Sequence, residues 1–209
     1  MNKEAQIKSL EDLKIDKILD GTPKDSSGDY DFTSLAKEIM NTIYIDNGRN
    51  KYRPIEIEFY IYDKDLHPDI LVYPRDEKKA GDVLYHLSGM DICFESSIKD
   101  GRFGGILIRA LEREKDGQQF GGPLICKDEV LNSAEGKCVV LRCDKEFTYD
   151  ISKVTRRKGF KGSKGSKDIY WDKNYRFVRD NIEKPIKRTE QQINPDTGEI
   201  VDKEKTCYL

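Results

Sequence analysis

The sequence predicts a single α+β domain with a curved, mainly antiparallel β-sheet flanked by N-terminal helices. Two observations lead to this fold class. Apolar residues recur at helical spacing over the first 50 residues, and from residue 54 onward they recur at strand spacing in short segments separated by turn residues. Helices followed by hairpins are typical of α+β domains. The 209 residues suffice for one domain with its own core.

The charge of the chain is uneven. The 37 basic and 39 acidic side chains nearly cancel, to a net charge of −2, which excludes a uniformly basic nucleic-acid-binding coat. Residues 151–188, however, carry 13 basic and 4 acidic side chains, whereas the rest of the chain carries 24 and 35. This basic segment is either a solvated loop or an anion-binding face, because clustered Lys and Arg attract phosphates.

Composition also bears on compartment and cofactors. No run of 18 apolar residues is present, and the charged N-terminus lacks the apolar stretch of a secretory signal. The five cysteines form no C-x-x-C pair, and two histidines at these spacings do not complete a zinc site. We therefore expect a cytoplasmic monomer with reduced thiols, no membrane segment, no metal and no other cofactor.

The first 50 residues predict a helical segment that packs on the core. Ile7, Leu10 and Ile18 indicate an amphipathic helix over 4–19, and a second helix is expected over 32–43. The glycosylase-like core is placed at residues 51–188, a range that includes the basic segment, and residues 189–209 are expected to form a polar tail.

Residues 54–62 alternate strictly between two kinds of side chain, which is typical of a half-buried strand. One face is apolar and the other carries two carboxylates and two tyrosines; the faces are Ile55, Ile57, Phe59 and Ile61, and Glu56, Glu58, Tyr60 and Tyr62. An irregular excursion is expected over 63–80, and a helix that begins at Pro123 is expected to run to about Leu131. Further strands are predicted at 82–86, 90–97, 104–111, 137–143, 146–151 and 175–179.

Glu58 and Tyr60 are the most unusual local feature. Side chains at i and i+2 of a strand share a face about 7 Å apart. A carboxylate beside aromatic walls suits a general base, and an aromatic ring can stack a flat ligand. The alternative is an ordinary solvent-exposed strand face.

The order of motifs over about residues 50–180 resembles the alkyladenine (3-methyladenine) DNA glycosylase family. Residues 55–60, followed by His67, are similar to that family's strand with a catalytic glutamate and a stacking tyrosine. Residues 81–94, 105–112, 122–126 and 175–179 are similar, in order, to its hairpin, its next strand, a helix start and its closing strand.

The resemblance implies a fold like that of the family and the hydrolysis of an N-glycosidic bond, after a damaged purine is flipped out of DNA. It implies that Glu58 activates the attacking water and that Arg109 holds a phosphate or that water. Tyr60, His67 and Tyr85 would sandwich the flipped base. No metal and no covalent intermediate are implied.

Two positions depart from the family pattern. Ser88 replaces the tyrosine that the family inserts as a wedge into DNA, and Glu95 replaces a pocket asparagine. The resemblance is therefore to a divergent member that lacks the wedge tyrosine. Besides Ser88, the residues expected to contact nucleic acid are the basic side chains Arg156, Arg157, Lys158, Lys161 and Lys164.

Two further groups allow two interpretations each. His86 and Asp91 either form a His–Asp pair beside the substrate, or His86 bonds to a nearby backbone carbonyl. Arg109 either contacts the substrate or forms a structural ion pair with Glu56 or Glu58.

Three functions therefore remain open. The first is a purine DNA glycosylase-like hydrolase that depends on Glu58. The second is a catalytically inactive nucleic-acid or nucleotide-binding module on the same fold. The third is a protein-interaction or structural module in which the basic segment is only a solvated surface.

Overall fold

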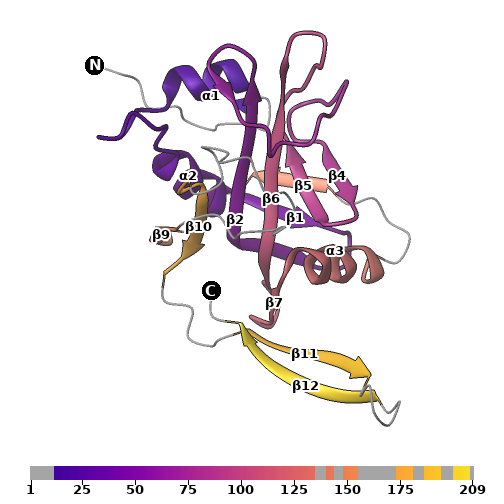
Figure 1. The fold of residues 1–209 in the computed structure, drawn as a ribbon. Helices are drawn as coiled ribbons and strands as arrows, with labels where there is room; N and C mark the ends of the chain where they lie inside the picture. The colour runs from indigo at the N-terminus through magenta and orange to yellow at the C-terminus, as the bar shows by residue number, and fades with distance from the viewer. Residues whose placement is uncertain are drawn as a thin grey trace.

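The computed structural model describes residues 12–134, 140–143, 148–154, 173–180, 186–193 and 200–207. In these residues the chain has the expected α+β architecture, with few helices and a curled antiparallel sheet (Figure 1). The two long strands β2 (Lys51–Asp63) and β6 (Arg102–Arg113) run side by side through its centre.

The other described elements follow in chain order: α1 (Ile15–Gly21), α2 (Thr33–Thr42), β1 (Ile43–Asp46), β3 (His67–Pro68), β4 (Val83–His86), β5 (Gly89–Cys93), β7 (Gln119–Gly121), α3 (Pro123–Asn132), β8 (Val140–Cys143), β9 (Ile151–Val154), β10 (Arg176–Arg179), β11 (Ile186–Ile193) and β12 (Ile200–Cys207).

The main sheet has the strand order β4-β5-β6-β2-β1-β8 among the described residues. Strands β3 and β10 also pair with β2, β7 pairs with β6, and β9 pairs with β10; the pairings are antiparallel. A sheet in which one strand has several partners along its length must bend, because the partners join it at different points. This bending gives the sheet its curled shape.

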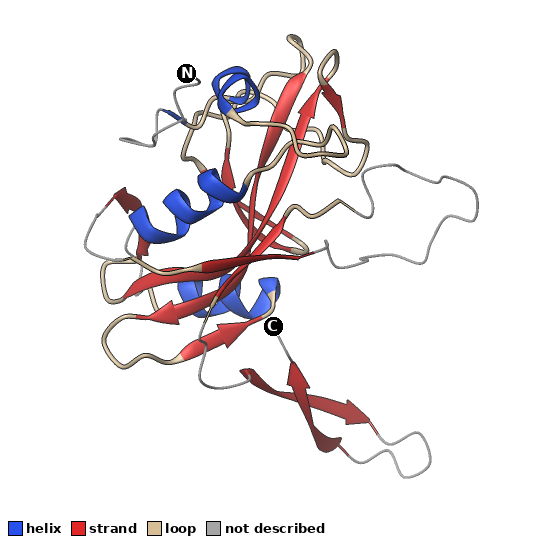
Figure 2. Ribbon diagram, turned by 90° about the vertical axis from the view of Figure 1, so that its left-hand side faces the viewer, coloured by secondary structure: helices blue, strands red, loops and turns tan. Residues whose placement is uncertain are grey.

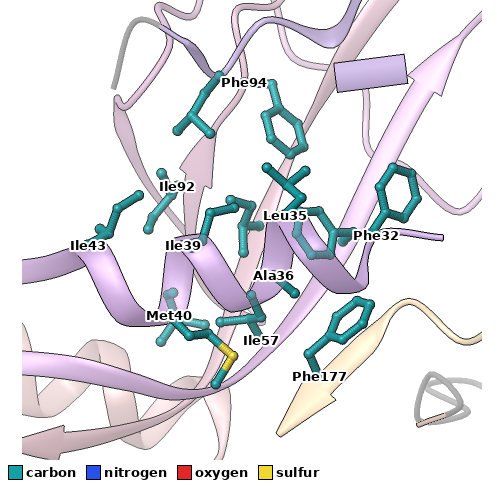
Figure 3. Packing of buried hydrophobic residues seen from close by; sticks show 14 of the residues in the cluster. Phe32, Leu35, Ala36, Ile39, Met40, Ile43, Ile57, Ile92, Phe94 and Phe177 are labelled. Carbon is teal, nitrogen blue, oxygen red and sulfur yellow. The ribbon is translucent and has the colours of Figure 1, made fainter. Parts of the chain in front are cut away.

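The apolar side of α2 packs on the sheet and forms the centre of the core (Figure 3). Leu35 and Ile39 of α2 lie against Ile57 of β2 and Phe177 of β10, and these four side chains are at most 4% exposed. Each buried side chain of this size contributes roughly 1.5–3 kcal/mol relative to an exposed one. The helical and strand periodicities of the sequence therefore meet at this interface.

Two N-terminal details differ from the predicted helices. In the described part, α1 begins only at Ile15, because Leu13 and Lys14 pair in strand fashion with Glu95: its N–H donates to the Leu13 carbonyl at 3.0 Å. Helix α2 ends at Thr42, and Ile43, which was expected in the helix, opens β1 between β2 and β8. Pairing with neighbouring strands overrides the local helical pattern at both places.

The C-terminal region contains strands where a polar tail was predicted. Strands β11 and β12 pair from Ile186 with Cys207 to Ile193 with Ile200, so the boundary placed at residue 189 falls inside β11. This hairpin is separate from the main sheet, lies beside β7 and extends away from the rest of the described fold (Figures 1 and 2). Its polar sequence lacks the apolar alternation by which the other strands were found.

Candidate functional site

The register of the sheet places several predicted site residues on one side, here called the polar face and defined by Glu56, Glu58, Tyr60, Asp91 and Arg109. Glu58 of β2 pairs with Leu107 of β6, and Leu107 pairs with Asp91 of β5, so these side chains form one row. Directly paired residues of an antiparallel sheet share a face. Unlike an ordinary strand surface, this face is buried: Glu56, Glu58 and Asp91 are 2%, 0% and 4% exposed.

Glu58, Tyr60 and Arg109 are in direct contact. The Tyr60 hydroxyl donates to Glu58 Oε2 at 3.0 Å, and Arg109 Nη1 donates to the same oxygen at 2.9 Å. The three residues that were predicted to carry the chemistry therefore meet at one carboxylate oxygen. The structure also contains the alternative arrangement for Arg109, because its guanidinium forms ion pairs with both Glu56 and Glu58.

Glu56 and Arg176 extend this cluster. Glu56 Oε1 accepts from Arg109 Nε at 3.0 Å and from Arg176 Nε at 2.5 Å. Two carboxylates and two guanidinium groups thus balance in charge, which offsets the cost of burying them. Burial by itself lowers the pKa of Arg109, but the carboxylates of Glu58 and Glu56 outweigh burial and raise that pKa. The cluster holds Arg109 as a cation.

His86 and Asp91 form the predicted pair. His86 Nε2 lies 3.1 Å from Asp91 Oδ1, and the Ser88 backbone N–H donates to His86 Nδ1 at 3.2 Å. Because Nδ1 accepts a hydrogen bond, the neutral ring carries its proton on Nε2 and donates it to Asp91. Asp91 Oδ2 also receives Arg75 at 2.8 Å. In this geometry both ring nitrogens of His86 are engaged within the protein.

His67 does not join Glu58, which corrects the expected base sandwich. His67 pairs with Asp63, an odd-numbered position of β2, and therefore faces the core, as Phe59 and Ile61 do. Its ring is 2% exposed, packs near Tyr30 and Tyr175, and has Nδ1 2.7 Å from the Ile61 carbonyl oxygen. The spacing of His67 from Glu58 resembles the family pattern, but the pairing register turns it to the opposite face.

Tyr85 also lies on the side opposite Glu58. It pairs with Met90, the residue next to Asp91 in β5, and consecutive strand residues point to opposite faces. The Tyr85 ring packs against the hydrophobic core, and burial raises the pKa of its hydroxyl. Of the three residues expected to enclose a base, only Tyr60 accompanies Glu58.

The β4–β5 turn contains Leu87 and Ser88. Ser88, at the position of the family's wedge, is exposed, and its neighbour Leu87 is 94% exposed. The turn is braced by Lys127, whose Nζ donates to the His86 carbonyl at 3.3 Å, and by close packing of Gly89 on Pro123. The exposed apolar side chain at this turn is therefore Leu87, which the motif comparison missed because it assigned the wedge to the next residue.

The remaining predicted residues lie elsewhere or outside the described part. Glu95 is exposed and forms a salt bridge with Lys14 at 2.9 Å. The five basic residues expected to contact nucleic acid lie outside the described residues; they are Arg156, Arg157, Lys158, Lys161 and Lys164.

Three charged residues of the buried cluster were not singled out as site residues from the sequence. Glu56 was visible, because it shares the strand face of Glu58 at i−2. Arg75 and Arg176 come from a loop and a distant strand, and no local pattern connects them with Glu58. Only the folded chain identifies them.

Two searches of the described residues gave negative results. No group of three or more His, Cys, Asp or Glu side chains there is arranged to hold a metal ion. Within the same part of the chain, no helix has the length and apolar character needed to cross a membrane.

Comparisons with known proteins identify no characterised relative. No protein-family model matches the chain, and no solved structure matches it. The chain is 28% identical over 133 residues to "Uncharacterized protein L759" of Acanthamoeba polyphaga mimivirus. The match covers 53% of this chain and 61% of the viral protein, so it spans less than two thirds of that relative's length.

Proposed function

We propose that the protein is a DNA glycosylase-like hydrolase that cleaves the N-glycosidic bond of a damaged, alkylated or deaminated, purine. The observation that carries the proposal is the contact of Glu58, Tyr60 and Arg109 at one carboxylate oxygen. A water-activating carboxylate, a cation that orients it and an aromatic ring beside them are the groups that this reaction requires. The resemblance in motif order supports the same reaction.

In this mechanism Glu58 accepts a proton from water as the water oxygen attacks C1′ of the sugar. The bond from C1′ to the purine nitrogen breaks, and its electron pair leaves with the base. An alkylated purine is already cationic and departs as a neutral base, so little acid catalysis is needed. Tyr60 stacks against the base, and Arg109 holds the Glu58 carboxylate in position.

The test uses duplex and single-stranded DNA that contains labelled hypoxanthine or a methylated purine. Wild-type protein is expected to release the free base, and Glu58→Gln is expected to reduce release at least 100-fold, because the amide cannot accept the proton. Glu114→Gln, a matched change of a carboxylate paired with Arg53, should retain wild-type release. Absence of release by wild type from every substrate would sink the hydrolase proposal.

A second candidate is a catalytically inactive nucleic-acid or nucleotide-binding module. The observation that favours it is the burial of Glu58, which is 0% exposed and already compensated by Arg109. A carboxylate held this way is a weaker base than one that faces only water and a ligand. The positions of His67 and Tyr85 on the opposite face favour the same candidate.

This candidate predicts binding without turnover. Affinity for a fluorescent oligonucleotide should fall steeply between 50 and 200 mM salt, because each phosphate contact releases a bound counterion. Changing Arg156, Arg157 and Lys158 to serine should weaken binding and flatten the salt dependence, whereas the exposed control Lys14→Ser should not. Binding that ignores salt would contradict a contact with the DNA backbone.

A further inference from the structure

The chain between β3 and β4 crosses the sheet and inserts one side chain into it. Within residues 73–77 Arg75 is buried, and the residues on either side of it are exposed. Its guanidinium lies over Gly105 of β6: a Cβ on that glycine would stand 2.6 Å from Arg75 Nη1. A glycine at this position leaves the room that the arginine fills.

The place that Arg75 occupies belongs to the polar face. Gly105 pairs with Tyr60 on one side and with Cys93 on the other, so the guanidinium lies in the row next to Glu58, Leu107 and Asp91. Diagonal neighbours on a sheet face are about 7–8 Å apart, within reach of a long side chain. Arg75 therefore covers the sheet beside the proposed site.

Arg75 is held by an ion pair rather than by apolar packing. Its Nη2 lies 2.8 Å from Asp91 Oδ2, with the two side chains 6% and 5% exposed, and its Nη1 lies 3.9 Å from Cys93 Sγ. When such a pair separates into water, both charges regain hydration, so separation costs less than the direct attraction suggests. A polar contact of this kind can open without unfolding the sheet.

The rest of the segment is attached at its ends and open in the middle. Lys78 and Ser96 exchange backbone hydrogen bonds at one end, and Val72 is 5% exposed near the other. Between them Tyr73 is 75% exposed, and Glu77 adopts a φ of +51°, a left-handed conformation that costs a non-glycine residue free energy. Apart from Arg75, little in this middle part holds it to the sheet.

We propose that residues 70–78 form a strap that closes the polar face, that the Arg75–Asp91 ion pair is its latch, and that its opening gives a ligand access to Tyr60 and Glu58. The identity of that ligand rests on the proposed function, but the strap and its latch do not. The strap accounts for a candidate catalytic carboxylate that is wholly buried in the closed state.

Cys93 is a natural probe of the strap, because it is 0% exposed and lies beneath Arg75. Cys126 of α3 is equally buried but packs in the core, where its Sγ lies 3.3 Å from the Phe120 carbonyl oxygen. The experiment measures the rate at which N-ethylmaleimide modifies each thiol, by peptide mass spectrometry. Arg75→Met and Asp91→Asn should each accelerate modification of Cys93 at least tenfold and leave Cys126 unchanged. Arg102→Met, which breaks the neighbouring ion pair with Asp63, should leave both rates unchanged.

The proposal is overturned if Cys93 reacts no faster in either variant, or if Cys93 and Cys126 accelerate together, since the pair would then stabilise the whole fold. Hydrogen exchange on the wild type is a check that needs no variant. Backbone amides of 70–78 should exchange at least tenfold faster than those of β5, and equal protection of the two would overturn the strap. None of these measurements uses a nucleic-acid substrate, so a failed strap and a failed hydrolase give different results.

Discussion

Arg109 Nη1 lies 2.9 Å from Glu58 Oε2, and the Glu58 side chain is fully buried. The same guanidinium reaches Glu56 through Nε, so one arginine compensates two carboxylates on neighbouring rows of the sheet. This arrangement makes Arg109 the residue on which the charge balance of the polar face depends.

Replacement of Arg109 by methionine is expected to destabilise the protein by about 3–5 kcal/mol, because it leaves buried carboxylates with less compensation. The measurement is the free energy of unfolding from urea denaturation. Adding Glu58→Gln to Arg109→Met should recover about 1–3 kcal/mol, since one of the stranded charges disappears. Lys14→Met, which breaks a half-exposed pair, should leave the midpoint unchanged. If the double variant is less stable than Arg109→Met, the two residues are not coupled as the contact indicates.

Asp63 should contribute to stability in a pH-dependent way. Burial by itself raises the pKa of Asp63, but hydrogen bonds from the Leu66 N–H, Arg102 and the Asp65 N–H lower it below its ordinary value of 3.8. A carboxyl whose folded pKa is depressed stabilises the fold above the unfolded pKa, and this contribution is lost as pH falls through the folded value.

The free energy of unfolding should therefore decline as pH falls below about 4, and Asp63→Asn should be less stable at pH 7 but lose less on acidification. Urea denaturation between pH 7 and pH 3 measures both effects. Asp65→Asn, in the same turn, is the control and should follow the wild-type curve. Parallel pH curves for wild type and Asp63→Asn would contradict the prediction.

Gly89 is expected to tolerate no side chain. Its φ is +148°, and a Cβ there would stand 2.5 Å from the Pro123 Cβ of α3. Gly89→Ala should combine overpacking, about 1–3 kcal/mol, with backbone strain of about 1–2 kcal/mol. Gly117→Ala is the matched control, since Gly117 also has a positive φ, of +67°, but open space around it. Thermal denaturation should show a clearly larger loss at Gly89; equal losses would mean that α3 yields to the added methyl group.

His67 should act on stability and not on ligand binding. His67→Ala leaves a cavity in the aromatic core and removes the ring from the Ile61 carbonyl, so a loss of about 2–4 kcal/mol is expected. Binding or base release, measured at a temperature where the variant remains folded, should equal that of wild type. A folded variant with reduced affinity would instead restore His67 to the site.

Leu87 should show the opposite behaviour. Because the side chain is 94% exposed, Leu87→Ala should change the free energy of unfolding by no more than about 0.5 kcal/mol. If DNA binds at the β4–β5 turn as proposed, the change should weaken binding, since apolar side chains inserted between bases stabilise bent DNA. Leu124→Ala, a partly exposed leucine on α3, is the control in a fluorescence-anisotropy titration. Unchanged affinity would remove the turn from the interface.

Several elements followed directly from sequence patterns. Period-two alternation located β2 and its two faces, and Pro123 marked the first residue of α3. The strands that escaped prediction lack such a pattern: β7 is three residues long and begins with glutamine, and β12 has no apolar alternation. Their pairing with other strands defines them.

The sequence by itself determined that Glu58 and Tyr60 share a strand face, because side-chain direction alternates along one extended segment. It did not determine which face His67 or Tyr85 would join. That depends on the register between strands, and a shift of one residue turns every side chain of a strand to the other side. Long-range contacts likewise brought Arg75, Arg109 and Arg176 to the carboxylates of the polar face. Tertiary structure therefore decided that the candidate site is a buried network of charges with one tyrosine rather than an open aromatic pocket.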